Sequence, residues 1–202
     1  MEHVKTQVTS WLEEVVIGLK LCPFAAVPWK AGEVKIVVSE VTDPEEAVKV
    51  ALDEALALLH PGDDGDGDDA GGEPAPDAPP KVRTTLVCFP KTLSDFETFL
   101  DAAETLEHIL SQAGADEMLQ VATFHPQYQF DGEDEAAVSH WTNRSPVPIL
   151  HLLSVGDVSD AVDSHPDAEK IPEENVARFE AMGIDALKAI WAKFQVTHGE
   201  TR

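Results

Sequence analysis

Short runs of β-branched and other apolar residues alternate with helical patterns along this chain. The runs span residues 34–38, 84–89, 119–125 and 149–153, and each is typical of a strand. Helical patterns separate the first three runs: one begins at Asp43-Pro44, with a capping side chain and a proline at the first helical position, and the other extends from Phe96 to Leu110. Strands joined through a helical crossover are usually parallel. The chain, residues 1–202, is therefore predicted to form a single α/β sandwich with a mixed, mostly parallel four-stranded sheet flanked by helices.

Further helices are predicted at both ends of this alternation. Apolar residues recur at helical spacing between Val4 and Leu19, which predicts an amphipathic first helix ending before Cys22-Pro23. After the last strand, residues 157–162 and 172–182 have helical patterns, and a final helix is expected from Asp185 onward. A chain of 202 residues is long enough for one full core.

Residues 62–80 interrupt the pattern with the sequence GDDGDGDDAGGEPAPDAPP. The segment holds no apolar residue larger than alanine, so it cannot bury enough surface to offset the entropy lost on ordering. A calcium loop is the alternative, because Asp64, Asp66 and Asp68 occupy alternate positions. However, Asp69 stands where an EF-hand needs glycine, and the closing Glu is missing. We expect an acidic, disordered insertion.

The charge of the chain excludes some classes of partner. With 38 acidic and 14 basic residues, the formal net charge is −24. Nucleic acids and anionic membranes are bound through clustered Lys and Arg, so neither is an expected partner. The acidity is compatible with a solvated surface or with adaptation to high salt. The charged N-terminal residues and the two cysteines, Cys22 and Cys88, predict a cytoplasmic protein without a disulfide framework.

The stretch from Leu119 to Leu153 holds the densest group of polar and titratable side chains between two apolar runs. His125 ends the third strand, where the carboxyl ends of parallel strands commonly bind ligands. Asn143, Arg144 and Ser145 lie in a proline-bounded loop, and His151 lies on the fourth strand. We therefore expect the functional site here.

Three motifs in this chain resemble the bacterial family DUF1415, a domain of unknown function. The resemblance rests on Ile17-Gly18-Leu19 with Leu21-Cys22-Pro23-Phe24-Ala25, on Leu119-Gln120-Val121-Ala122 with Phe124-His125-Pro126-Gln127-Tyr128-Gln129-Phe130, and on Thr142-Asn143-Arg144-Ser145-Pro146 with His151-Leu152-Leu153. It implies a cytoplasmic bacterial protein of one domain, and it implies no activity. The chain departs from the family pattern at Lys20, Trp141, Ser154 and Glu174, and the last two positions lose an expected arginine.

Each candidate residue has a functional and a structural interpretation. His125 is a candidate general acid or base, or it fixes the following turn by hydrogen bonds. Arg144 is a candidate anchor for a carboxylate or phosphate, or a clamp on main-chain carbonyls. Cys22 is a candidate nucleophile, although it follows the carboxyl end of a helix, where the dipole opposes a thiolate. His151 shares its strand face with Ile149 and Leu153, which also fits a core histidine.

Gln127, Asn143, Ser145 and His151 complete the predicted substrate-binding set. A zinc ion bound by Cys22, His125 and His151 would fit the residue types, but no ligand spacing supports it. We therefore expect neither a metal nor a cofactor.

Three functional hypotheses remain. The first is an enzyme that acts on a small anionic or amide-bearing metabolite, with His125 as acid or base and Arg144 as anion anchor. The second is a non-catalytic metabolite-binding module, and the third is a structural or partner-binding protein. The sequence leaves the oligomeric state open.

Overall fold

The computed structural model describes residues 1–60 and 81–194. The predicted disordered insertion, residues 62–80, lies outside the described residues. Within the described ranges, no helix is both long and apolar enough to cross a bilayer.

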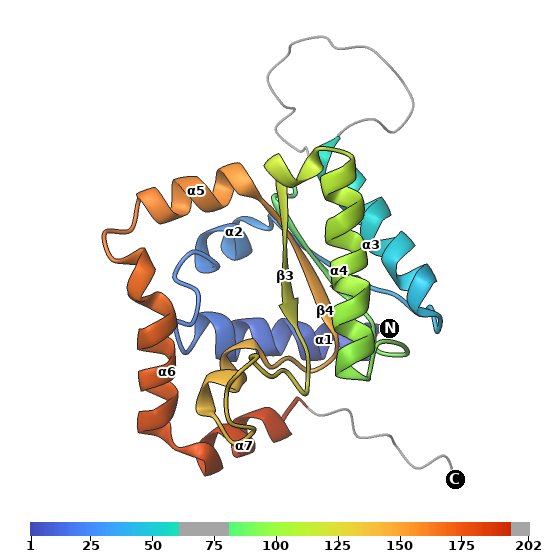
Figure 1. Cartoon of the computed structure of the whole chain (residues 1–202). Coiled ribbons are helices and arrows are strands. Elements are labelled where there is room, and N and C mark those ends of the chain that lie inside the picture. Colours follow the sequence, from blue (N-terminus) through green and yellow to red (C-terminus); the bar gives the residue numbers. More distant parts are fainter. Residues whose placement is uncertain (61–80, 195–202) are drawn as a thin grey trace.

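A four-stranded mixed sheet forms the centre of the fold (Figure 1). The strands are β1 (Val34–Val38), β2 (Thr84–Cys88), β3 (Leu119–Phe124) and β4 (Ile149–Ser154), in the order β1-β2-β4-β3. β1 is parallel to β2, whereas β4 is antiparallel to both β2 and β3. Strands β1, β2 and β3 therefore run in the same direction, as their helical crossovers predict. The sequence pattern did not indicate that β4 lies between β2 and β3.

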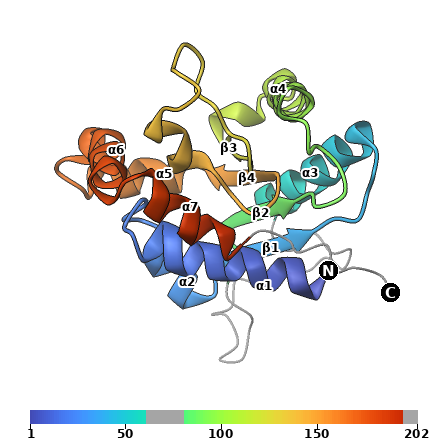
Figure 2. The same cartoon turned by 90° about the horizontal axis from the view of Figure 1, so that it is seen from below.

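Two helices cover the first face of the sheet. They are α3 (Pro44–Leu59) and α4 (Phe96–Gln112), whose first turns are capped by the side chains of Asp43 and Asp95. Their apolar stripes pack on Val87, Leu150 and Leu152 in a closed core. Figure 2 shows this helical layer on one side of the sheet and the amino-terminal helices on the other.

The second face is covered by the first helices and the last helix of the described residues. Here lie α1 (Glu2–Trp11), its continuation η1 (Leu12–Ile17) and α7 (Ile184–Ala192), which pack in a second core with Cys88 and Ile149. The single helix predicted from Val4 to Leu19 is present, but its second half is a wider π-helical turn. A side chain at Gly18 could not fit after this turn, because an added Cβ would lie 2.4 Å from the Glu14 carbonyl oxygen.

Three further helices stand beside the second face rather than on it. They are α2 (Ala26–Ala31), α5 (Val155–Asp163) and α6 (Ile171–Met182), seen at the left of Figure 1. No side chain of α2 or α5 is fully buried. Short 3-10 turns complete the structure: η2 (Ala115–Glu117), η3 (Val138–Asn143) and η4 (Ala168–Lys170). The helices predicted after the last strand are thus present, whereas α2 was not predicted.

Candidate ligand-binding site

The second face of the sheet is covered at one end only. The pairing registers place its side chains in three rows: Val38, Cys88, Ile149 and Phe124; then Ile36, Leu86, His151 and Ala122; then Val34, Thr84, Leu153 and Gln120. Cys88 and Ile149 in the first row are 0% exposed, whereas Gln120 in the third row is exposed. We call the second and third rows the floor, because Leu86, Ala122, His151 and Leu153 of these rows line a cavity.

A cavity of about 710 Å³ lies over this floor. Its floor includes Leu86, Ala122, His151 and Leu153, and its walls come from η1, the loop Cys22–Ala25, and α5. Most of the lining side chains are apolar, so we call it the apolar cavity. Its volume falls within the range of pockets that bind drug-sized molecules.

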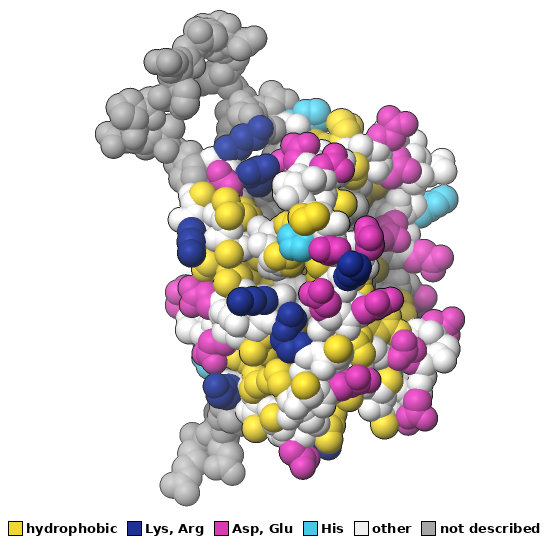
Figure 3. All heavy atoms as spheres, turned by 90° about the vertical axis from the view of Figure 1, so that its left-hand side faces the viewer, with side chains coloured by type: hydrophobic (Ala, Val, Ile, Leu, Met, Phe, Trp, Pro, Cys, Tyr) yellow, Lys and Arg dark blue, Asp and Glu magenta, His cyan; other side chains and the backbone are white. Residues whose placement is uncertain are grey.

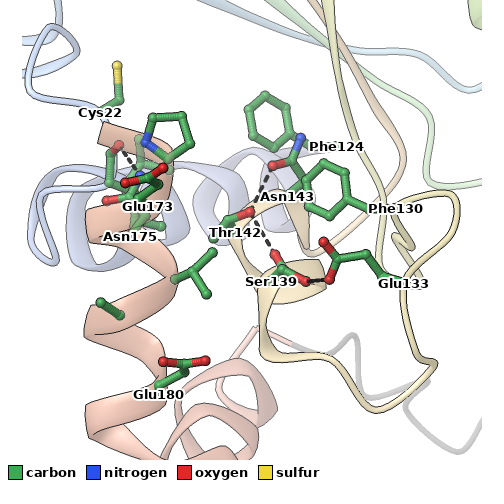
Figure 4. A pocket seen from close by; sticks show the side chains of 15 residues that line it. Cys22, Phe124, Phe130, Glu133, Ser139, Thr142, Asn143, Glu173, Asn175 and Glu180 are labelled. Carbon is green, nitrogen blue, oxygen red and sulfur yellow. Dashed lines mark hydrogen bonds between the residues drawn. The ribbon is translucent and has the colours of Figure 1, made fainter. Parts of the chain in front are cut away.

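A second hollow of about 730 Å³ adjoins the first. It lies between η3 and α6 and shares Val16, Cys22 and Phe124 with the apolar cavity. Figure 4 shows its polar side chains: Ser139, Thr142 and Asn143 come from η3, and Glu173, Asn175 and Glu180 come from α6. We call it the outer cavity. The two hollows share three lining residues and are therefore neighbours, and we call them the two compartments of the candidate site.

Charged side chains lie at the mouth of the apolar cavity. Arg83 donates two hydrogen bonds to the Asp157 carboxylate, one of them from Nε at 3.1 Å, and it lies 3.8 Å from Glu33. Hydrophobic side chains remain exposed among acidic and basic ones on the side of the molecule where α5 and α6 lie (Figure 3). The charges nearest the apolar cavity therefore largely pair with one another.

Two aromatic side chains form the boundary between the covered and uncovered ends of the floor. The ring of Trp11 packs edge-on against Phe124, with centroids 5.5 Å apart. Trp11 lines the apolar cavity and is 1% exposed, and its indole Nε1 has no hydrogen-bond partner among the described residues. A buried donor without a partner is uncommon because it has lost its hydration without compensation.

His151 lies at the centre of the floor, and Thr84 defines its tautomer. The Thr84 hydroxyl donates to the Leu152 carbonyl at 2.7 Å, so it accepts from His151 Nε2 at 2.6 Å. Burial lowers the pKa of His151 to about 4. The imidazole is therefore neutral near pH 7, with its proton on Nε2 and a lone pair on Nδ1.

Cys22 lies where the two compartments meet. It is half-buried, and its backbone N–H donates to the Val16 carbonyl at 3.3 Å, just after the π-helical turn. Burial raises the pKa of the Cys22 thiol, although main-chain hydrogen bonds from Phe24 and Ala25 act in the opposite direction. The side chain is therefore protonated near neutral pH, as expected of a wall residue.

Asn175 fixes the loop that carries Cys22. Its Nδ2 donates to the Leu21 carbonyl at 2.7 Å, and its Oδ1 accepts from Arg178 at 2.7 Å. Arg178 also donates to the Lys20 carbonyl at 3.4 Å. α6 thus holds the loop between η1 and α2 in place, and this loop forms a wall of both compartments.

His125 lies outside both compartments. It is 0% exposed and packs against both Phe96 and Phe99 of α4, with each ring centroid 5.1 Å away. Its Nδ1 accepts from the Gln127 backbone N–H at 3.0 Å, so Nε2 is the protonated nitrogen and donates to the Leu93 carbonyl at 3.0 Å. Burial lowers the pKa of His125. A ligand could reach either nitrogen only by displacing a main-chain group.

Arg144 and Ser145 also lie away from the two compartments. The Arg144 guanidinium stacks on Trp141 at 4.3 Å, is half-buried, and forms no ion pair among the described residues. Burial lowers the pKa of Arg144. Ser145 is buried and donates to the Val147 carbonyl at 2.6 Å. The predicted meeting of His125 and Arg144 in one hollow is not observed, because the two side chains pack against α4 and Trp141 respectively.

The predicted site residues are therefore only partly brought together. Cys22, Asn143 and His151 line the site, whereas His125, Gln127, Arg144 and Ser145 do not. Asn143 donates to the Thr123 carbonyl at 3.2 Å, which joins η3 to β3. Among the described residues, no group of three or more His, Cys, Asp or Glu side chains could hold a metal ion, so Cys22, His125 and His151 do not form the conceivable zinc set.

Several important residues were not singled out from the sequence. Trp11 and Leu12 resembled ordinary helix-core positions, and Phe124 an ordinary strand residue. The sequence did hold a signal near Asn175, because this residue ends the segment Pro172-Glu173-Glu174-Asn175, in which Glu174 departs from the family pattern. Pro172, Glu173 and Asn175 line the outer cavity, whereas Glu174 does not.

The three sequence motifs meet around the two compartments, and they lie within the part of the chain that a known family matches. All three sequence motifs contribute lining residues: Cys22 to Ala25 from the first, Gln120, Ala122 and Phe124 from the second, and Asn143, His151 and Leu153 from the third. No curated protein and no solved structure is significantly similar to the chain. The family described as "Protein of unknown function (DUF1415)" matches residues 3–66 and 75–189, which is most of the chain. The chain therefore belongs to the DUF1415 family.

Proposed function

We propose that this protein is a non-catalytic binding module for an apolar or amphipathic small molecule. The observation that carries the proposal is the apolar cavity of about 710 Å³, with Trp11, Cys22, Phe124 and His151 in its lining. An apolar pocket with a few convergent polar groups is the usual form of a small-molecule site. The ligand body would lie over the floor of the sheet, between η1 and α5.

The walls of the cavity support a small molecule as the ligand. α2 and α5 border the hollow without burying a whole side chain of their own. Val158 and Ala161 of α5 line the hollow, so a ligand would bury apolar surface that the protein alone leaves half-covered. Burial of such surface contributes about 25 cal/mol per Å².

The state of the titratable groups favours binding over catalysis. A general acid or base is most effective when its pKa lies near the working pH. The pKa of His151 is lowered to about 4, and the pKa of Cys22 is raised by burial. Both nitrogens of His125 are occupied by main-chain groups. The hypothesis with His125 as acid or base would require that histidine to leave its buried position.

A cytoplasmic location is part of the proposal. Both cysteines are free thiols, which suits a reducing compartment.

The test uses the neutral fluorophore N-phenyl-1-naphthylamine, which fluoresces strongly only in apolar surroundings. We expect saturable binding to the full-length protein. Ala122→Phe fills the cavity from the floor and Ala161→Phe fills it from α5, so each should weaken binding at least about tenfold.

Ala192→Phe provides the matched control, because Ala192 is exposed on α7 and lines neither compartment. It should bind the probe as the parent protein does. Thermal melts of all three variants would verify folding. Saturable binding that is unchanged in both cavity variants would show that the probe lies elsewhere, and it would overturn the proposal.

A further inference from the structure

We infer that the ligand of the apolar cavity is an uncharged molecule whose apolar body carries a hydrogen-bonding group such as a hydroxyl. This inference rests on the proposed function and specifies the class of ligand. Its physical basis is a set of polar groups in the lining that are neutral and lack partners.

The first group is a donor. The side chain of Trp11 is 1% exposed, and its Nε1–H is buried without a hydrogen-bond partner among the described residues. Indole nitrogen can only donate a hydrogen bond. A hydroxyl or carbonyl oxygen on the ligand would satisfy it, whereas an ammonium group could not.

The second group is an acceptor. The Thr84 hydroxyl accepts a hydrogen bond from the Nε2–H of His151, which leaves Nδ1 as the ring's only acceptor, and Nδ1 forms no hydrogen bond within the described residues. A hydroxyl proton could be donated to it. A carboxylate brought to the same place would meet a lone pair rather than a proton. Trp11 and His151 both line the apolar cavity, and both rings lie next to Phe124, with centroids at 5.5 and 6.2 Å from that ring.

The charges around the site oppose an anion. Arg83, the basic residue at the mouth, is paired with Asp157 and lies near Glu33. The outer compartment is lined by Glu133, Glu173 and Glu180, with no Lys or Arg. A carboxylate in the apolar cavity would lose its hydration without gaining a counter-ion. Two acids line the apolar cavity itself, but Asp157 is paired with Arg83 and Asp160 is exposed to water. An amine inside the cavity would therefore lose its hydration without meeting a buried, unpaired counter-ion.

The experiment displaces N-phenyl-1-naphthylamine with three ligands of one chain length: 1-decanol, decanoate and decylamine, at pH 7.5. We expect decanol to displace the probe at concentrations at least about tenfold lower than either charged analogue. Displacement of the probe by decanoate at the same concentration as decanol would overturn the inference. Equal displacement by decylamine would also overturn it, and would instead place the head group in the outer cavity. Failure of the probe itself to bind would be a failure of the proposed function, and the two results are therefore distinguishable.

A variant pair tests the donor. Trp11→Phe keeps an aromatic ring and removes the N–H, so it should weaken decanol binding about threefold to tenfold more than it weakens binding of the probe, which cannot accept that hydrogen bond through a hydroxyl. Trp141→Phe is the control, since Trp141 lines neither compartment. Equal decanol binding by Trp11→Phe and the parent protein would contradict the role of the indole. Should Trp11→Phe not fold, the ligand series on the parent protein decides the question.

Discussion

The hydroxyl of Thr84 lies 2.6 Å from Nε2 of His151, and its single proton is already donated to the Leu152 carbonyl at 2.7 Å. The threonine therefore fixes which nitrogen of the histidine carries the proton. β2 and β4 supply the two residues, and their antiparallel pairing brings Thr84 opposite Leu153 and Leu86 opposite His151. This hydrogen bond between two strands leaves Nδ1 of His151 as a hydrogen-bond acceptor on the cavity floor.

His151 should make the protein less stable in mild acid. Its pKa is lowered from about 6.5 to about 4 in the folded state, so the unfolded chain binds more protons between these values. The free energy of unfolding should fall as the pH falls through this window, by about 1–3 kcal/mol after allowance for the partial exposure of the ring. Urea denaturation at pH 7.5 and pH 4.5 would measure the loss. His151→Gln should lose less than the parent protein, whereas His108→Gln, an exposed histidine on α4, should match the parent.

Removing the His125 ring should destabilise the fold without affecting the site directly. His125→Ala leaves a cavity beside Phe96 and Phe99 and removes the partner of the buried Leu93 carbonyl and of the part-buried Gln127 N–H, which costs about 2–4 kcal/mol. The midpoint of chemical denaturation gives the effect, and His108→Ala serves as the exposed control. An unchanged midpoint together with lost binding of N-phenyl-1-naphthylamine would instead identify His125 as a ligand contact.

Asn175 should couple the stability of α6 to the shape of the site. Asn175→Asp keeps an acceptor for Arg178 but cannot donate to the Leu21 carbonyl. We expect a loss of about 1–3 kcal/mol in unfolding free energy and weaker binding of the fluorescent probe, because the Cys22 loop loses its attachment. Glu174→Gln is the control on the same helix. Equal binding by Asn175→Asp and the parent would show that the loop is held by other contacts.

The two thiols should differ in reactivity. Burial raises the pKa of Cys88 to about 12, and Cys88 is 0% exposed, so iodoacetamide should modify it only after unfolding. Cys22 should react slowly at pH 8 and more slowly still with N-phenyl-1-naphthylamine bound, since it lines both compartments. Mass spectrometry of the labelled protein would separate the two sites. Labelling of Cys22 at the rate of a free thiol, with no protection by the probe, would contradict its place in the wall.

Arg144 should contribute modestly to stability. Its guanidinium stacks on Trp141 and has no ion-pair partner among the described residues, and its Nε is buried without a hydrogen bond. Arg144→Ala loses the stacking energy but also removes the unsatisfied nitrogen, so we expect a net loss of about 1 kcal/mol or less. The thermal melt would change little, while the tryptophan emission spectrum should shift. A change of several kcal/mol would reveal a bracing contact that the described residues do not show.

The local patterns of the sequence predicted most elements but few of their side-chain environments. Asp43-Pro44 and the stripe from Phe96 to Leu110 correctly indicated α3 and α4, because caps and helical periodicity act over a few residues. The π-helical end of the first helix was not predictable in this way, since its hydrogen bonds shift by one residue without changing the apolar pattern.

Residue types and motif positions pointed to the stretch from Leu119 to Leu153, which supplies Phe124, Asn143 and His151 to the two compartments, while the geometry within that stretch came from packing. His125 and His151 look alike in sequence, each ending or lying in an apolar run, yet they face opposite sides of the sheet. The sequence by itself determined that three strands joined through helical crossovers run in the same direction. It also determined that Cys22, Asn143 and His151 belong to the motifs that resemble the DUF1415 family. Only the tertiary structure decided that β4 lies between β2 and β3 and that α1 covers one end of the second face. The cavity lies at the other end of this face. Its position depends on which elements, distant in sequence, pack against the sheet, and the periodicity of a single segment does not indicate those contacts.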